Sequence, residues 1–277
     1  MNWVCYNGKI ISLDELQLNP FNRSFLFGDG WFDSLRVCES DIPLWPYHYV
    51  RNRKTALALG MDTSSFPDGL TWKDNLIELC RKNGHTDARL RISFFRAGAG
   101  LYTPESNNFE WIASSSPVLD GNEPVAQSAL LGISSYRKNP GVLSEYKISS
   151  SIIYVLAALE RKSMGMDELI LLNDQHKVVE TIAGNLFWFE SGRLHCPPLS
   201  DGSVDGVFRQ YVLNQCHKIG VDFFEKSVSL AELKNADAVF YCNAVSGIFP
   251  VSKIEDKVFG TDLVWQIRSK MQSELWS

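Results

Sequence analysis

The sequence predicts a mixed α/β protein with two domains, and three observations lead to that prediction. Segments with the alternation of strands and segments with the spacing of helices follow one another along the whole chain. A stretch over 115–124 is rich in Ser, Pro, Gly and Asn, as linkers between domains are. The sequence shows no internal repeat, which argues against a solenoid. We therefore expect a smaller α/β domain over 1–114 and a larger one over 125–277.

Turn and strand signals dominate the N-terminal half. Asn7-Gly8 between two apolar runs predicts a tight hairpin. Pro46 is typical of the first turn of a helix and Gly60 of the residue that ends one, so we expect a helix between them. The other expected elements are strands over 34–37, 42–45, 88–96 and 111–118 and a helix over 71–83.

The C-terminal half alternates in the same way. The segment 148–165 has a strong helical pattern, with Ile152, Val155 and Leu159 on its apolar side. The run AVFYCN at 238–243 is expected as the last strand. The remaining expected elements are strands over 130–136, 168–172, 178–181, 185–190 and 193–198, and helices near 206–219, 229–236 and 261–276.

The composition is that of a globular protein, with 45% hydrophobic and 21% charged residues among 277. The formal net charge is −5, and no dense basic run occurs, so neither a nucleic acid nor an anionic membrane is expected as a partner. No window approaches the roughly 20 apolar residues that a membrane-spanning helix needs. The first residues carry no basic leader, so we expect no signal peptide.

Cysteine and histidine give no sign of a metal site. The 6 cysteines form no C-x-x-C pair, and the 5 histidines do not cluster with them at the spacing of metal ligands. We therefore expect no metal, and reduced thiols in a cytoplasmic protein.

Short motifs taken one at a time leave the function open. Gly28-Asp29-Gly30 lacks both the Lys-Ser/Thr ending of a phosphate loop and the third glycine of a dinucleotide fingerprint. The sequence has no G-x-S-x-G and no H-E-x-x-H. On these grounds alone, no reaction is indicated.

Several segments in order resemble the class IV, or fold-type IV, pyridoxal-phosphate enzymes, and are closest to the aminodeoxychorismate lyases. The resemblance extends from about residue 7 to residue 251. It implies the two-domain fold of that family, with pyridoxal 5'-phosphate at the domain interface, the cofactor lysine in the C-terminal domain and a homodimer as the assembly. The segments that carry it are FLFGDGWFDSLRV, HYVR, RISFFRAGAG, YKISS, DELILLNDQHKVVETIAGNLFWF, GVFRQYVL and CNAVSGIFPV.

The resemblance assigns roles to residues of this chain. Lys147 matches the lysine that forms an imine with the cofactor, a role that needs an amine which is uncharged part of the time. Glu180 matches the carboxylate that pairs with the pyridine nitrogen and keeps it protonated, so that the ring accepts electrons from the substrate. Both are therefore expected as catalytic residues.

The same resemblance implies a phosphate site. Arg51 matches the phosphate-binding arginine, and it shares a predicted helix face with His48. Val207 and Phe208 open a predicted helix, whose first N–H groups suit an anion. Asn243 lies where the last cofactor loop of the family falls.

Details of these segments favour a lyase over an aminotransferase. Aminotransferases of the family often carry threonine where this chain has Phe208, and a threonine-bearing loop where it has Cys242-Asn243-Ala244. The resemblance then implies a 4-amino-4-deoxychorismate lyase of the folate pathway, which gives 4-aminobenzoate and pyruvate. The alternatives are an aminotransferase acting on branched-chain or D-amino acids and, more remotely, a non-catalytic relative that binds a partner.

A cation and three aromatic residues are candidates for binding an anionic amine substrate. Arg96 ends an alternating strand and could bind a carboxylate, although a surface ion pair is an equal possibility. Phe27, Trp31 and Tyr102 could line the pocket, although aromatic residues at such positions are more often in the core.

Overall fold

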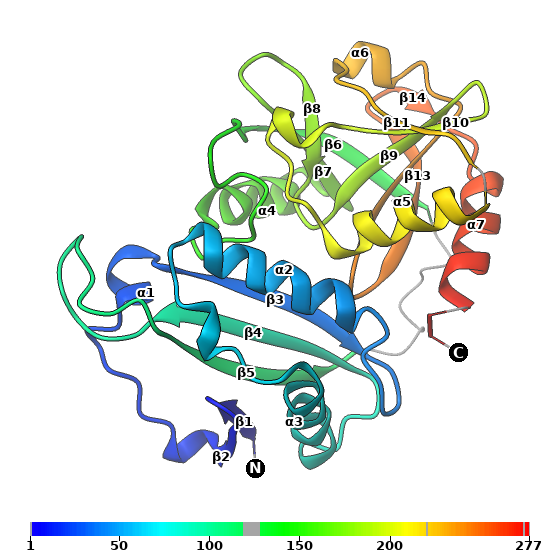
Figure 1. The fold of residues 1–277 in the computed structure, drawn as a ribbon. Coiled ribbons are helices and arrows are strands. Elements are labelled where there is room, and N and C mark those ends of the chain that lie inside the picture. The colour runs from blue at the N-terminus through cyan, green and yellow to red at the C-terminus, as the bar shows by residue number, and fades with distance from the viewer. Residues whose placement is uncertain (1, 119–127, 220, 274, 277) are drawn as a thin grey trace. The chain divides into compact units, whose positions relative to one another are not determined.

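The computed structural model describes residues 2–118, 128–219, 221–273 and 275–276 (Figure 1). Its contacts group the chain into two compact units. The first unit is Met1–Leu119 with Tyr146–Ser150, and the second is Asp120–Glu145 with Ser151–Ser277. Within the stretch expected as a linker, residues 115–117 complete a strand, and 119–124 lie outside the described residues.

The first unit is built on an antiparallel five-stranded sheet in the order β2-β1-β5-β4-β3. Helix α2 packs on β3, and helix α3 packs on β1, β4 and β5 (Figure 1). The elements are β1 (Trp3–Tyr6), β2 (Lys9–Ser12), β3 (Gly30–Val37), β4 (Ala88–Arg96), β5 (Phe109–Pro117), α1 (Arg23–Phe27), α2 (Trp45–Ala58), α3 (Gly69–Lys82) and the 3-10 helices η1 (Leu13–Glu15) and η2 (Thr63–Ser65).

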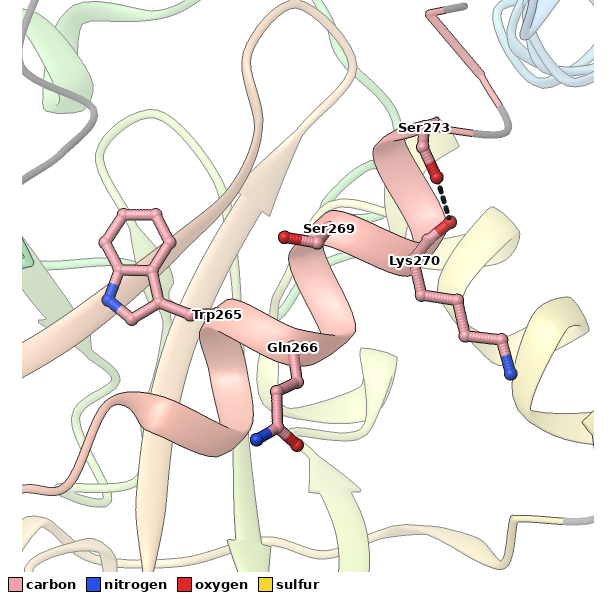
Figure 2. Close-up of a pocket in the computed structure, with 5 residues that line it drawn as sticks. All are labelled: Trp265, Gln266, Ser269, Lys270 and Ser273. Carbon is pink, nitrogen blue, oxygen red and sulfur yellow. Dashed lines mark hydrogen bonds between the residues drawn. The ribbon is translucent and has the colours of Figure 1, made fainter.

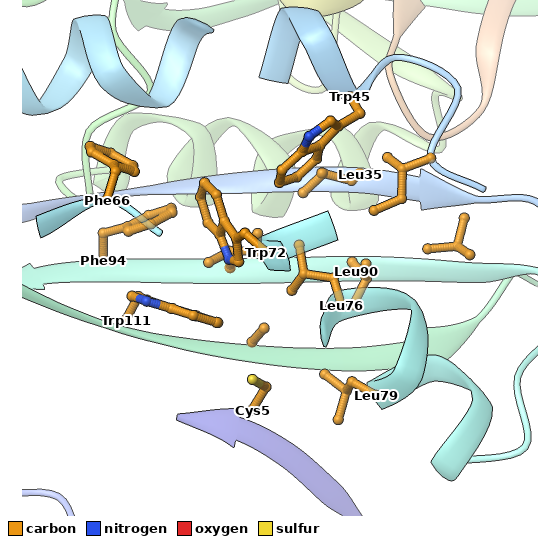
Figure 3. Close-up of a cluster of buried hydrophobic side chains, with 14 of the residues drawn as sticks. Cys5, Leu35, Trp45, Phe66, Trp72, Leu76, Leu79, Leu90, Phe94 and Trp111 are labelled. Carbon is orange, nitrogen blue, oxygen red and sulfur yellow. The ribbon is translucent and has the colours of Figure 1, made fainter. Parts of the chain in front are cut away.

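Alternation along the strands fills an aromatic core between this sheet and its helices. Trp31 of β3 stacks on Phe94 of β4, with ring centroids 4.3 Å apart. Trp72 of α3 meets Phe94 edge-on, and both side chains are fully buried (Figure 3). Large rings remove much apolar surface from water and favour such offset and edge contacts, so they stabilise this face of the sheet.

One expected strand of this half does not form. Residues 42–45 were expected to pair with 34–37, but Cys38 and Asp41 close a tight turn and α2 begins at Trp45. Pro43 has no N–H to donate, and Pro46 in the first turn directs the chain into the helix.

Lys147 belongs to the first unit because its segment pairs with the edge of β3. Phe32 donates its N–H to the carbonyl oxygen of Lys147 at 3.0 Å, and Ser149 donates to Gly30 at 2.9 Å. These bonds satisfy an otherwise open sheet edge. They also shorten the helix expected over 148–165, which begins at Ile152. The expectation that Lys147 lies in the C-terminal domain is corrected accordingly: backbone pairing holds it in the first unit.

The second unit contains a mixed nine-stranded sheet in the order β11-β10-β9-β12-β13-β6-β7-β8, with β14 paired to β13. Strand β6 is parallel to both β13 and β7. The elements are β6 (Ala129–Arg137), β7 (Glu168–Leu172), β8 (Val178–Thr181), β9 (Asn185–Glu190), β10 (Arg193–Cys196), β11 (Phe223–Glu225), β12 (Ala238–Asn243), β13 (Gly247–Ile254), β14 (Lys257–Val258), α4 (Ile152–Met164), α5 (Val207–Ile219), α6 (Leu230–Leu233), α7 (Asp262–Ser273) and the 3-10 helix η3 (Leu199–Asp201).

Some features of this unit differ from the sequence prediction. Strands β11, β13 and β14 were not expected. Pro250 argued against an interior strand at 247–254, yet it lies opposite Phe240 in β13. Helix α4 leaves Ile152, Val155 and Leu159 exposed by 64%, 51% and 62% rather than burying its apolar side.

Candidate active site

The residues assigned by the sequence fall into two groups, one in each unit. The first unit holds Arg51 and Lys147, and the second holds Glu180, the start of α5 and Asn243.

In the first unit, helix α2 directs His48 and Arg51 onto one buried carboxylate. They lie three positions apart on α2 and share a face. Asp33 of β3 is fully buried and accepts hydrogen bonds from the Arg51 guanidinium, from Nδ1 of His48 at 2.9 Å and from Nδ2 of Asn52 at 2.9 Å. A buried carboxylate needs such donors, and here they orient the arginine from behind.

The charges within this cluster follow from burial and pairing. Burial by itself opposes ionisation of Asp33, but Arg51 and His48 outweigh it and hold the pKa of Asp33 well below its usual range. Burial lowers the pKa of His48, so the ring is neutral and its Nδ1–H donates to Asp33. The cluster therefore contains one guanidinium and one carboxylate.

The amine of Lys147 lies beside this cluster. Its Nζ is 4.8 Å from the centre of the Phe32 ring. Burial and the nearby Arg51 lower the pKa of Lys147 to about 8, and the carboxylate of Asp33 offsets part of that shift. A lysine with this pKa is neutral for an appreciable part of the time near neutral pH, and a neutral amine is the nucleophilic form.

In the second unit, Glu180 is buried and surrounded by donors. Its Oε1 accepts the hydroxyl of Tyr154 at 2.6 Å and lies 3.3 Å from Nζ of Lys138. Its Oε2 accepts the N–H of Val204 at 3.0 Å. Glu180 thus accepts hydrogen bonds from Tyr154 and Val204 and forms an ion pair with Lys138.

The start of α5 is held next to Glu180 by Asn185. The side chain of Asn185 donates to the carbonyl oxygen of Val204 at 2.8 Å, in the segment just before the helix. A Cβ atom on Gly206 would lie 2.0 Å from Oδ1 of Asn185, so this close packing requires glycine. The side chains of Val207 and Phe208 are buried, and it is therefore their backbone N–H groups that a ligand could reach.

Asn243 lies at the same end of the sheet. Its neighbour Cys242 pairs with Asn185, which places the end of β12 beside the segment that precedes α5. The Oδ1 atom of Asn243 accepts the N–H groups of Val245 and Ser246 at 3.0 and 2.9 Å. With its oxygen engaged in the turn, Asn243 has its amide N–H₂ as the group that can donate to an anion.

Two of the substrate candidates are engaged within the first unit, Arg96 in an ion pair and Trp31 in the core. Arg96 is buried; it donates to Oδ2 of Asp29 at 2.9 Å, to Oδ1 of Asn107 at 2.9 Å and to the carbonyl oxygen of Leu59 at 2.6 Å. Trp31 is buried in the aromatic core. Both side chains are therefore buried among partners within the first unit.

The other two substrate candidates are accessible. Phe27 is 39% exposed and Tyr102 is 88% exposed, and their ring centroids are 5.6 Å apart. Arg23 shapes the loop that carries Tyr102 by donating to the carbonyl oxygens of Gly100 and Leu101. The pair remains available as an aromatic surface for a ligand.

Sequence reasoning did not identify Asp33, Lys138 or Tyr154. Asp33 could have been found from the alternation of β3, which places it on the same face as Trp31 and towards α2. Tyr154 and Lys138 carry no comparable signal, because their relation to Glu180 arises from packing of α4 and the end of β6 against β8.

A separate hollow runs along α7 and contains none of the predicted residues. It is shallow, with a volume of about 680 Å³, and is lined by Trp265, Gln266, Ser269, Lys270 and Ser273. Figure 2 shows these side chains along one helix, with the hydroxyl of Ser273 donating to the carbonyl oxygen of Lys270. Because none of the residues assigned by the sequence lines this hollow, it is not assigned to the site.

Across 2–118, 128–219, 221–273 and 275–276, no three His, Cys, Asp or Glu side chains lie together in a way that could hold a metal ion. In the same ranges, no helix combines the length and the apolar character needed to cross a membrane.

Comparison with known sequences finds one family over most of the chain. The family described as amino-transferase class IV matches residues 30–254. A putative branched-chain-amino-acid aminotransferase of Methanocaldococcus jannaschii is 26% identical over 281 residues, which cover 98% of this chain and 94% of that protein. An aminodeoxychorismate lyase of Vibrio harveyi is 29% identical over 263 residues, which cover 92% of this chain and 91% of that protein.

Comparison with solved structures agrees. The 4-amino-4-deoxychorismate lyase of Pseudomonas aeruginosa matches with a TM-score of 0.87 and 26% identity, over 99% of this chain and 100% of that one. The mixed α/β fold expected from the sequence is therefore confirmed.

Proposed function

This chain belongs to the class IV aminotransferases, a family of pyridoxal-phosphate-dependent enzymes, and we propose that within the family it is a 4-amino-4-deoxychorismate lyase. Its products would be 4-aminobenzoate and pyruvate, as in folate biosynthesis. The observation that carries the proposal is Phe208, whose buried ring lies in the first turn of α5, where aminotransferases of the family often have a threonine hydroxyl. The relatives named as lyases, at 29% and 26% identity, support it.

The donor groups of each unit fit the cofactor. The first unit offers a lysine amine of lowered pKa together with the Arg51 guanidinium. The second offers the Glu180 carboxylate, the backbone N–H groups of Val207 and Phe208 and the amide of Asn243. An aldehyde requires the amine, a phosphate requires the cation and the N–H groups, and a pyridine nitrogen requires the carboxylate.

Lys147 would act first as a nucleophile and then as a base. When bound, pyridoxal phosphate supplies an aldehyde that takes up amines and a ring that accepts electrons from the substrate. Nζ of Lys147 would hold that aldehyde until a substrate amine takes its place. Nζ would then be free to take the proton from the carbon that bears the substrate nitrogen, for which a pKa of about 8 is well matched to neutral pH.

Glu180 and the phosphate-binding residues would hold the cofactor in place. Glu180 keeps a proton at the pyridine nitrogen, which strengthens the ring as an electron acceptor. Arg51 supplies the paired N–H donors that suit a phosphate, with Asp33 fixing its orientation. The electron pair left by the proton that Lys147 takes would expel the enolpyruvyl group, so that the substrate gives aromatic 4-aminobenzoate and pyruvate.

A product assay tests the lyase assignment. Purified protein is incubated with 4-amino-4-deoxychorismate, and 4-aminobenzoate and pyruvate are measured as equal amounts. Lys147→Ala is expected to abolish both products, and borohydride treatment of the wild type is expected to attach the cofactor to the peptide of Lys147. A colourless protein without such a tag would contradict the cofactor role and support a non-catalytic relative.

An aminotransferase is the second candidate, because several relatives of similar identity bear that name. The same preparation is assayed with pairs of branched-chain or D-amino acids and oxo acids. Formation of oxo acid and pyridoxamine phosphate, without 4-aminobenzoate, would replace the lyase assignment.

We further propose a homodimer in the cytoplasm. The exposed stripe of Ile152, Val155 and Leu159 on α4 supports a self-association surface, and the 6 cysteines, free in the structure, support a reducing compartment. Light scattering of the wild type should give twice the mass of the chain. A monomer at micromolar concentration would contradict the dimer.

A further inference from the structure

The environment of Glu180 assigns different tasks to its two oxygens. An ionised carboxylate offers about four acceptor positions, two on each oxygen. Tyr154 and Lys138 both approach Oε1, at 2.6 and 3.3 Å, whereas Val204 takes one position on Oε2 at 3.0 Å. Acceptor capacity therefore remains on Oε2.

Lys138 is held in place as firmly as the carboxylate. It is only 8% exposed and also donates to the carbonyl oxygens of Gly202 and, at 3.4 Å, Ser144. Two of the three N–H donors of its ammonium group go to these oxygens, and the Glu180 carboxylate, 3.3 Å away, pairs with its charge. Lys138 is thus a fixed cation and not a second free amine.

Tyr154 contributes a directional hydrogen bond. Burial and the charge of Glu180 raise the pKa of Tyr154 well above its ordinary value, so its hydroxyl keeps the proton that it donates. The Lys138 ammonium lies 5.9 Å from the centre of the Tyr154 ring, which packs the two side chains on the same side of the carboxylate.

We propose that Tyr154 and Lys138 are positioning residues that fix the rotation of the Glu180 carboxylate and leave Oε2 as the acceptor for the pyridine nitrogen. This inference rests on the proposed cofactor role of Glu180. Its consequence is specific: Tyr154 and Lys138 act on the cofactor only through the ring nitrogen, because neither is assigned to the aldehyde or the phosphate.

A cofactor analogue without the ring nitrogen isolates this effect. Apoprotein is titrated with pyridoxal phosphate and with 1-deazapyridoxal phosphate, in which a C–H replaces that nitrogen, and both dissociation constants are measured by quenching of tryptophan fluorescence. Tyr154→Phe and Lys138→Met are each expected to weaken binding of pyridoxal phosphate about tenfold and to leave the analogue within about twofold. Glu180→Gln should show the same pattern, and Lys138→Arg should restore most of the affinity.

Matched controls exclude a general effect of the substitutions. Tyr136→Phe and Lys162→Met change the same residue types in the same unit, at exposed side chains that are not partners of Glu180, and should alter neither constant. Near-ultraviolet circular dichroism verifies that each variant is folded. If Lys138→Met does not fold, Lys138→Arg with Tyr154→Phe carries the comparison.

The outcomes separate this inference from the proposed function. Equal losses for both ligands would show a merely structural role and overturn the inference, as would no loss for either. In both cases, borohydride labelling of Lys147 would still stand. Failure of the wild type to bind pyridoxal phosphate at all would instead overturn the proposed function together with the inference.

Discussion

Phe32 and Lys147 are joined by a backbone hydrogen bond of 3.0 Å from the N–H of Phe32 to the carbonyl oxygen of Lys147. The bond places Lys147 on the edge of β3, and Asp33 is the next residue along that strand. The segment of the reactive lysine is thereby paired to the sheet that carries the aromatic core, which keeps its backbone rigid.

The first prediction concerns the proton affinity of Lys147. In the apoprotein, its amine should titrate at a pH of about 8, because burial and Arg51 disfavour the charged form. Arg51→Met should raise this midpoint, since it removes a cation and frees the charge of Asp33. Reductive ¹³C-methylation followed by an NMR titration measures it, with Lys147→Arg identifying the signal. Arg53→Met is the control, and a wild-type midpoint near 10.5 would contradict the prediction.

The second prediction concerns Asp33 and stability. Asp33→Asn leaves Arg51 without its buried carboxylate and should lower the free energy of unfolding by about 3 kcal/mol at pH 7. The pKa of Asp33 is lower in the folded protein than its ordinary 3.8, so the stabilisation is complete above about pH 5 and is lost as the pH falls through the folded value. The difference from wild type should therefore shrink towards pH 3.

Urea unfolding followed by tryptophan fluorescence at pH 7, 5 and 3 measures this difference. Asp74→Asn, on the exposed side of α3, provides the control and should change stability little at any pH. A pH-independent difference between Asp33→Asn and wild type would refute the pairing argument.

The third prediction concerns the close packing at the start of α5. Gly206→Ala brings a Cβ atom to 2.0 Å from Oδ1 of Asn185, which must move and release the segment at Val204. We expect affinity for pyridoxal phosphate to fall about tenfold while the protein stays folded. Gly260→Ala, where no atom lies within 4 Å, should bind normally, and equal affinities of the two variants would count against the packing argument.

The fourth prediction separates structure from substrate binding at Arg96. Arg96→Met should destabilise the protein by about 3 kcal/mol, because it removes a donor from Asp29, from Asn107 and from the carbonyl oxygen of Leu59. In the folded variant, KM for an anionic substrate should change less than twofold. A large rise in KM at unchanged stability would restore Arg96 as a substrate residue.

Much of the fold was predictable because its signals are local. The alternation in residues 88–96 predicted β4 with the bounds that the structure has, and Pro46 and Gly60 bracketed α2 correctly. The ordered segments around Arg51, Lys147 and Glu180 indicated the family, and the comparisons confirm it. Periodicity and motif order depend on residues that are near one another in the sequence, so they can be recognised without knowing how the chain packs.

Tertiary structure decided which groups meet. Only packing shows that Arg96 pairs with Asp29 and that Lys147 lies on the edge of β3, since the partners in both cases are distant in sequence. The same holds for Tyr154 and Lys138 beside Glu180. The sequence determined the reactive side chains and the elements that carry them; their hydrogen-bond partners and proton affinities depend on burial and on distances between elements, which arise only when the chain is folded.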